Sequence, residues 1–144
     1  MVRAPGLLVV GLDAMDASLA RRLVAEGRMP NLADLLDTGA WAPVQNAEGL
    51  VVGSSWPSFA TGVGPATHGF YCFRQFVNGR YEIRRFSPLD VDAEPYWDVL
   101  SRAGLRCMVF DVPLSRPSDC LHGAQIVDWG SHDRMLESTA VSQI

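Results

Sequence analysis

Leu7-Leu8-Val9-Val10-Gly11-Leu12-Asp13 is the stretch of this sequence that decides the fold class. Its apolar residues run on without the alternation of a half-exposed strand, so the stretch predicts a short β-strand buried on both faces. Strands of this kind occur mainly in parallel sheets that helices cover. Further apolar runs over 106–112 and 125–129 predict two more strands of the same type. We therefore expect an α/β fold built on a parallel sheet flanked by helices.

Helical patterns follow the first run. Asp16 is a candidate N-cap for a helix with apolar residues at helical spacing, and this helix should end near Gly27. Pro30 begins a second short helix, which Gly39 should end and whose leucines (Leu32, Leu35, Leu36) should point inward. The residues 41–45 predict another strand.

The centre of the chain predicts a β-hairpin. Asn78-Gly79 is a strong turn signal between alternating residues. We expect the hairpin to form an insertion that spans about residues 70–90. Residues 58–61 predict a helical stretch before it. Residues 96–103 have apolar side chains at i, i+3, i+4 and i+7, so they predict a helix that ends at Gly104.

Composition excludes several classes of protein. The chain has 144 residues, and its basic residues are 12 arginines without a lysine, against 16 acidic residues and a net charge of −4. A globally basic nucleic-acid binder and a lysine nucleophile are therefore excluded. The longest apolar run is far shorter than the ~20 residues of a membrane span, and no signal-peptide pattern is visible. We expect a cytoplasmic protein without a membrane partner, whose three cysteines stay reduced.

Asp13 is the first candidate site residue. It directly follows the first predicted strand, and ligands bind at the carboxyl edge of open α/β sheets. A carboxylate at this position either belongs to a metal or phosphate site or caps the next helix. Asp16 already fits the capping role, which leaves both interpretations of Asp13 open.

The glycine- and serine-rich segment 53–69 is the second candidate. The hydroxyls of Ser54, Ser55 and Ser58 lie where a helix can begin, and free N–H groups at such a place favour a phosphate or sulfate that a hydroxyl could attack. The alternative is a serine-capped helix inside a loop. His68, alone before a glycine, is more typical of a hydrogen-bonded structural residue than of a metal ligand, and His122 and His132 lack ligand partners at helical spacing.

Aromatic and basic residues alternate over 70–86, where four arginines lie among six aromatic residues. Aromatic side chains could stack on bases while arginines hold phosphates, which makes single-stranded nucleic acid one conceivable partner. The alternation favours a hairpin with one packed face and one solvated arginine face. We therefore do not expect nucleic acid as a partner.

Several motifs together resemble one family. They are Leu7 to Asp13, Arg28-Met29-Pro30-Asn31-Leu32, Trp56-Pro57-Ser58-Phe59-Ala60-Thr61-Gly62, Pro65-Ala66-Thr67-His68-Gly69, Tyr96-Trp97-Asp98-Val99-Leu100 and Phe110-Asp111-Val112-Pro113. In this order they are similar to the type I phosphodiesterase/nucleotide pyrophosphatase family of the alkaline phosphatase superfamily. The resemblance covers most of the chain, from about Leu7 to Asp133.

The resemblance implies an alkaline-phosphatase-like α/β domain that hydrolyses small-molecule phosphate esters. Family members use two divalent metal ions, usually zinc, with manganese or magnesium as alternatives, and a serine or threonine nucleophile that forms a phospho-enzyme. Asp13 matches the first metal-ligand aspartate of the family. His68 matches the motif histidine, which is structural there.

Two departures from the family pattern matter. The nucleophile usually lies nine positions before the threonine of Thr61-Gly62, and that position is Val52. The local pattern Ser55-Trp56-Pro57-Ser58 indicates Ser55 instead, although its spacing to Thr61 is three residues too short. Ser54 lies between these two positions, so either Ser54 or Ser55 is the candidate nucleophile. The later Asp-x-x-x-His and Asp-His-Gly motifs are absent, and one carboxylate cannot hold two zinc ions, which need about three or four ligands each. We therefore expect residues 1–144 to be the N-terminal part of a single domain, an incomplete sheet that is inactive alone. The alternative is a non-catalytic phosphate- or nucleotide-binding module with the same fold.

Overall fold

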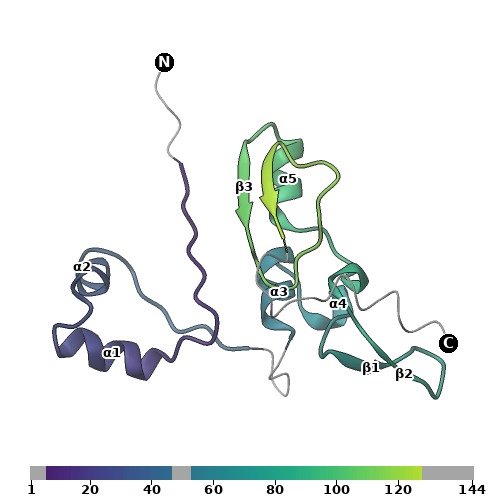
Figure 1. The fold of residues 1–144 in the computed structure, drawn as a ribbon, viewed down its shortest axis with the longest axis horizontal. Coiled ribbons are helices and arrows are strands. Elements are labelled where there is room, and N and C mark those ends of the chain that lie inside the picture. Colours follow the sequence, from purple (N-terminus) through teal and green to yellow (C-terminus); the bar gives the residue numbers. More distant parts are fainter. Residues whose placement is uncertain (1–5, 47–52, 128–144) are drawn as a thin grey trace. The chain divides into compact units, whose positions relative to one another are not determined.

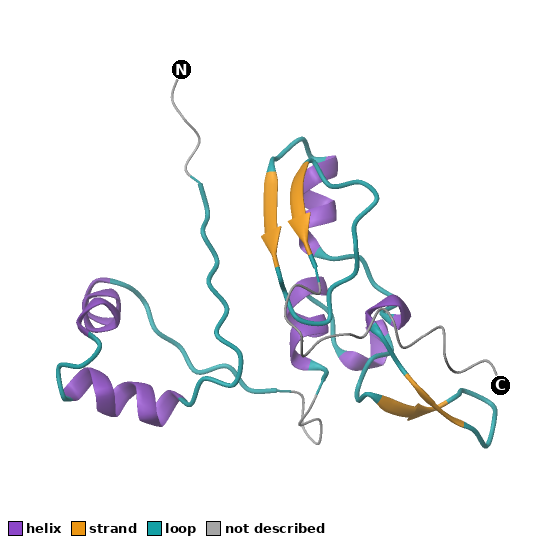
Figure 2. Cartoon of the chain, in the orientation of Figure 1, coloured by secondary structure: helices purple, strands orange, loops and turns teal. Residues whose placement is uncertain are grey.

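The computed structural model describes residues 6–46 and 53–127 of the chain. The chain divides into two compact units, Met1–Val44 and Gln45–Ile144. Figure 1 labels the elements along the chain, and Figure 2 shows them by type. The described residues contain no helix that is long and apolar enough to cross a membrane.

The first unit contains two helices, both as predicted. Helix α1 spans Ala17–Ala25, and the Asp16 side chain caps it by accepting a hydrogen bond of 2.7 Å from the Leu19 N–H. Its last carbonyls are satisfied in turn by N–H groups of the chain that leaves the helix, Gly27 to Val24 (3.0 Å) and Arg28 to Leu23 (2.9 Å). Helix α2 spans Pro30–Thr38, begins on its proline and ends at Gly39.

The predicted strand over 7–12 is wrong for this structure. The segment is extended but is not a strand (Figure 2), and it is exposed rather than buried, with Leu7 88% and Leu8 84% accessible. An extended segment becomes a strand only when a neighbouring backbone pairs with its N–H and C=O groups, and no described strand does so. The strand predicted over 41–45 is a loop for the same reason, and Leu35 on α2 is 66% exposed instead of inward.

The second unit contains the one parallel pair among the described strands. Strand β3 (Cys107–Phe110) pairs with β4 (Gly123–Ile126) in the register Cys107↔Gly123 to Phe110↔Ile126. This confirms the parallel arrangement and the second predicted strand. Strand β4 begins two residues before the predicted run, and residues 128 and 129 lie outside the described residues. The two strands are joined by the loop 111–122 instead of a helix.

The core of the second unit lies between α5, β3 and α3. Helix α3 spans Ser55–Thr61 and extends the stretch predicted over 58–61, and α5 spans Tyr96–Arg102 as predicted. The core centres on Trp97, Val109 and Ala60. Trp97 is 1% exposed, and full burial of a large apolar side chain is worth about 2–3 kcal/mol. Only one face of β3 is covered, because Met108 and Phe110 are 85% and 58% exposed.

The predicted β-hairpin is confirmed. Strands β1 (Arg74–Phe76) and β2 (Ile83–Arg85) pair antiparallel, and a bond of 2.8 Å from the Val77 N–H to the Glu82 carbonyl extends the pairing towards the Asn78-Gly79 turn. The division of its faces differs from the prediction. Gln75 and Arg84 form the inner face, while the outer face carries two arginines and two apolar residues: Arg74, Phe76, Ile83 and Arg85.

Candidate functional site

Two serines begin helix α3, and the structure distinguishes them by exposure. Ser54 occupies the N-cap position, is 2% exposed, and its hydroxyl makes no capping hydrogen bond to the helix. Ser55 is the first helical residue and is exposed. Its hydroxyl donates a hydrogen bond of 2.8 Å to Asn46 Oδ1. Of the two predicted nucleophiles, Ser55 is therefore the one that solvent reaches in this structure.

Gly53, which directly precedes the serine pair, lies against two aromatic rings. Its φ is +88°, a left-handed conformation that favours glycine. A Cβ atom at this position would lie 3.1 Å from Cε1 of Phe70 and 3.7 Å from Cε2 of Phe73. The two rings meet edge to face with centroids 6.0 Å apart. The backbone before Ser54 therefore approaches the Phe70–Phe73 pair as closely as only a glycine allows.

His68 ends helix α4 (Pro65–His68) and is fully buried. Its Nδ1 accepts a hydrogen bond of 3.1 Å from the Phe70 N–H, and its Nε2 lies 2.9 Å from Ser58 Oγ. A backbone N–H can only donate, so the Nδ1 lone pair is occupied and the ring proton sits on Nε2, where it donates to Ser58. His68 therefore cannot take a proton from Ser58, and the pair is no catalytic dyad.

Burial has a second effect on His68. Desolvation lowers the pKa of the ring below its ordinary value of 6.5, so the neutral form is the stable one. A neutral histidine with both nitrogens hydrogen-bonded is the arrangement of a structural residue. His122 is exposed, and its carbonyl receives the Cys107 N–H, while His132 lies outside the described residues.

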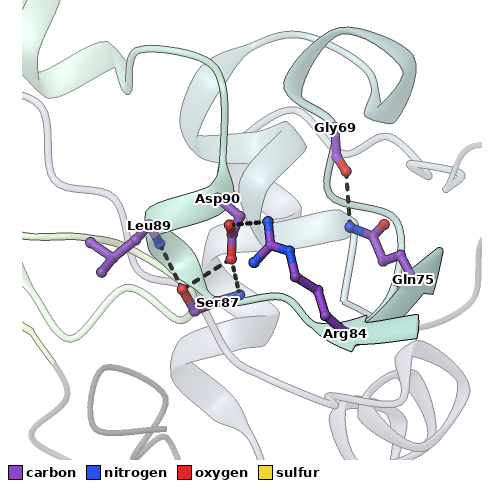
Figure 3. Close-up of polar contacts among 6 residues, drawn as sticks. All are labelled: Gly69, Gln75, Arg84, Ser87, Leu89 and Asp90. Carbon is purple, nitrogen blue, oxygen red and sulfur yellow. Dashed lines mark hydrogen bonds and ion pairs between the residues drawn. The ribbon is translucent and has the colours of Figure 1, made fainter. Parts of the chain in front are cut away.

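Gln75 fixes the hairpin to the segment that follows His68. Its amide nitrogen donates to the Gly69 carbonyl at 3.1 Å, as Figure 3 shows, and its Oε1 accepts the Tyr71 N–H at 3.0 Å. Gln75 is 2% exposed, and both ends of its amide are used. The glycine that follows His68 is therefore tied to strand β1.

The other strand of the hairpin is fixed by an ion pair. Arg84 donates to Asp90 Oδ1 at 2.6 Å, and Asp90 Oδ2 accepts the Ser87 N–H at 2.8 Å (Figure 3). Asp90 ends the short 3-10 helix η1 (Pro88–Asp90), which Ser87 caps through the Leu89 N–H. Burial raises the pKa of Asp90, but the bonds from Arg84 and Ser87 outweigh it and hold the pKa below 3.8.

These contacts use part of the aromatic and basic stretch over 70–86. Phe70 is fully buried, and Arg84 both pairs with Asp90 and lies over the Phe86 ring at 4.1 Å. A stretch whose groups are occupied in this way matches a packed hairpin. The arginines that remain on its outer face are Arg74 and Arg85.

Asp13 lies in the first unit, in a turn that directly follows the extended run, and is exposed. Within the described residues it belongs to no group of three potential metal ligands. The one such group is Glu94, Asp98 and Cys120, whose ligand atoms lie within 4.8 Å of one another. There Arg102 pairs with Glu94, and Ser118 Oγ donates to Asp98 at 2.6 Å. The described residues by themselves therefore do not fit two metal ions.

Asp111 is a carboxylate that sequence reasoning passed over. It directly follows β3 at the carboxyl edge of the parallel pair, the edge where α/β sheets bind ligands. Its φ is +46°, which is uncommon for a residue other than glycine and often marks a functional position. The sequence placed Asp111 inside the run 106–112, and it stands in the motif Phe110-Asp111-Val112-Pro113, so its position after the strand became visible only when β3 ended at Phe110.

The family model of type I phosphodiesterase / nucleotide pyrophosphatase matches residues 7–134. The chain therefore belongs to the type I phosphodiesterase/nucleotide pyrophosphatase family. This match supports the resemblance on which the site residues were assigned, and the family is generally metal-dependent. No curated protein and no solved structure matches the chain.

Proposed function

We propose that this chain supplies the nucleophile-bearing part of a metal-dependent hydrolase of phosphodiesters or nucleotide pyrophosphates. Its domain is an alkaline-phosphatase-like α/β domain, and its substrates are small-molecule phosphate esters. The observation that carries the proposal is the exposed Ser55 hydroxyl at the start of α3, beside Ser54, within the segment that matches the family. Ser58 is less suited to the role, because it is half-buried and His68 holds its ring proton towards Ser58 and so offers it no base.

The covalent step in this proposal uses Ser54 or Ser55. The serine hydroxyl loses its proton to solvent as its oxygen forms a bond to phosphorus, and the bond to the ester oxygen breaks, so that the leaving group departs with that oxygen and takes up a proton. Water then hydrolyses the phosphoserine, which releases the phosphate and restores the serine hydroxyl. Ser55 reaches solvent as the chain stands, whereas Ser54 needs the loop at Gly53 to shift before a substrate can reach it. Both residues stay in the proposal, and mutation distinguishes them.

Two divalent ions are the proposed cofactors, with zinc as the first choice and manganese or magnesium as alternatives. Asp13 is the residue of this chain that we assign to them. Two zinc ions need about six to eight ligands between them, and we propose that residues beyond those of this chain complete the site. We therefore propose that the 144-residue chain does not turn over substrate by itself.

The test is an assay of bis(4-nitrophenyl) phosphate hydrolysis with zinc or manganese. It compares this chain with the product of a gene segment that is extended past Ile144 for as long as an open reading frame continues. We expect turnover only in the longer product, loss of that turnover in Asp13→Asn, and loss in one of Ser54→Ala and Ser55→Ala. Ser58→Ala, the matched control, should keep activity. Turnover by the 144-residue chain that Asp13→Ala abolishes would contradict the claim that further residues are needed.

A second candidate is a non-catalytic module that binds phosphate or a nucleotide through residues 53–58. It is favoured by the bonding of the serines, since Ser55 donates to an amide oxygen and Ser58 accepts from His68, so neither has a base at hand. Stoichiometric binding of a phosphate ester without metal, together with no hydrolysis in the longer product, would support this module over the hydrolase.

We place either activity in the cytoplasm as part of the same proposal. Cys72, Cys107 and Cys120 are all free thiols, and a reducing compartment keeps them so.

A further inference from the structure

One cleft in the second unit is lined by two residues that each carry a buried polar atom without a hydrogen-bond partner. It lies between α3, α5 and the loop after β3, and its cavity volume is about 20 Å³. Among the described residues, Trp97 Nε1 and Ser115 Oγ are the two buried side-chain atoms that have no hydrogen-bond partner. Trp97 and Ser115 both line this cleft.

Such groups are rare in folded proteins. A buried donor or acceptor left unpaired costs about 1–3 kcal/mol, so two in one cleft indicate a missing partner. The volume exceeds the ~10–15 Å³ that a single water needs, so the cleft has room for one small polar group.

The wall of the cleft defines the chemistry of that group. Trp97 Nε1 can only donate, and Ser115 can donate as well. Arg116 is the one charged residue on the wall, and no described carboxylate pairs with it. The remaining lining is almost all apolar: Pro57, Ala60, Pro88, Val91, Ala93, Pro95 and Leu114, together with Thr61, whose hydroxyl already donates to the Pro57 carbonyl.

We propose that this cleft binds a small carboxylate, whose oxygen atoms accept hydrogen bonds from Trp97 and Ser115 and whose charge Arg116 balances. A cleft with donors, one positive charge and no carboxylate of its own selects an anionic acceptor. The site is separate from the serine pair, because neither Ser54 nor Ser55 lines the cleft.

The test observes the Trp97 indole N–H by nuclear magnetic resonance while sodium acetate is added to the 144-residue chain. Sodium chloride at equal ionic strength is the control, and Trp97→Phe assigns the signal. We expect a saturable shift of the Trp97 signal with acetate but not with chloride, while the indole signals of Trp41 and Trp56 stay in place.

Two variants test the residues. Arg116→Gln should weaken acetate binding about tenfold or more, since it removes a charged donor, whereas Arg106→Gln, an exposed arginine off the cleft, should not. Ser115→Ala should also weaken acetate binding without lowering stability, because the Ser115 hydroxyl has no partner to lose. Ser118→Ala is the control: Ser118 does not line the cleft and its hydroxyl bonds to Asp98, so this change should leave acetate binding unaltered.

Two results would overturn the proposal. In one, the Trp97 signal responds equally to acetate and chloride and shows a lasting cross-peak to water, which means that the cleft is only hydrated. In the other, the signal shows neither an acetate response nor a water contact.

Discussion

Single residues set the geometry at the start of α3. Gly53 combines a positive φ with a close approach to the Phe70 ring, and His68 holds Ser58 from the other side of the loop. The first contact is possible because glycine has no Cβ, and the second depends on the ring proton on Nε2 of His68. Substitutions at these two positions should therefore have large and specific effects.

Gly53→Ala should destabilise the second unit more than the matched change Gly62→Ala. Both glycines have a positive φ, +88° and +69°, so alanine is strained at either position by about 1 kcal/mol. Only at Gly53 does the new Cβ also meet an aromatic ring. We expect a loss of about 1 kcal/mol for Gly62→Ala and about twice that or more for Gly53→Ala, measured by urea unfolding. Equal losses would show that the rings move aside freely.

His68 should make stability depend on pH. Burial lowers its folded pKa below 6.5, so the unfolded chain binds the proton first as the pH falls. The contribution of His68 is complete above pH 6.5 and declines as the pH falls below it. Unfolding midpoints between pH 7 and pH 5 should therefore decrease in the wild type.

His68→Gln should lower stability at pH 7 and flatten this decrease, because the group that binds the proton is gone. His122→Gln, at an exposed histidine, is the control and should retain the wild-type pH dependence. The range stays above pH 5 so that Asp90, whose pKa lies below 3.8, keeps its charge throughout.

At the scale of elements, the hairpin rests on polar contacts of its inner face. Asp90→Asn removes the charge that Arg84 pairs with, and we expect a loss of about 1–2 kcal/mol by urea unfolding. Arg85→Thr on the outer face should cost nothing or stabilise by a few tenths of a kcal/mol, because Arg85 lies directly opposite Arg74. A larger loss for Arg85→Thr than for Asp90→Asn would reverse this assignment of the faces.

Local signals predicted the elements whose backbone hydrogen bonds form between residues close in sequence. Asp16, Pro30 and the Asn78-Gly79 turn each act within a few residues, and the helices and hairpin that they predicted are present. The strand over 7–12 failed because pairing depends on a neighbour that no local pattern names. Strand β3 was predicted correctly, but the prediction that both its faces are buried was wrong, because one face is exposed.

The candidate site was predictable only in part for a related reason. The motif order identified the serine pair and Asp13 as candidates, and these assignments stay predictions. The surroundings of the two serines include the bond from Ser55 to Asn46 and the approach of Gly53 to the Phe70 ring, and the motifs single out neither Asn46 nor Gly53. The bond between Phe70 and His68 Nδ1, which decides the position of the ring proton, likewise exists only once the loop has folded.

At the scale of the whole molecule, buried and exposed apolar side chains alternate along strand β3. Val109 is 7% exposed in the core, whereas Met108 beside it is 85% exposed. We expect Val109→Ala to cost about 1–3 kcal/mol and Met108→Glu to stay within about 0.5 kcal/mol while raising solubility. Thermal unfolding and the saturation concentration measure the two effects. A strong destabilisation by Met108→Glu would mean that this face is covered in solution.

The loop 111–122 between β3 and β4 also sets the order of events during folding. A parallel pair forms its first bond only after the whole connection has closed, and the entropy of that closure precedes any gain from pairing. Helix α5 and the hairpin close over far shorter spans. Strand pairing should therefore follow the formation of α5 and of the hairpin, and a nascent chain would expose β3 until the ribosome has released β4.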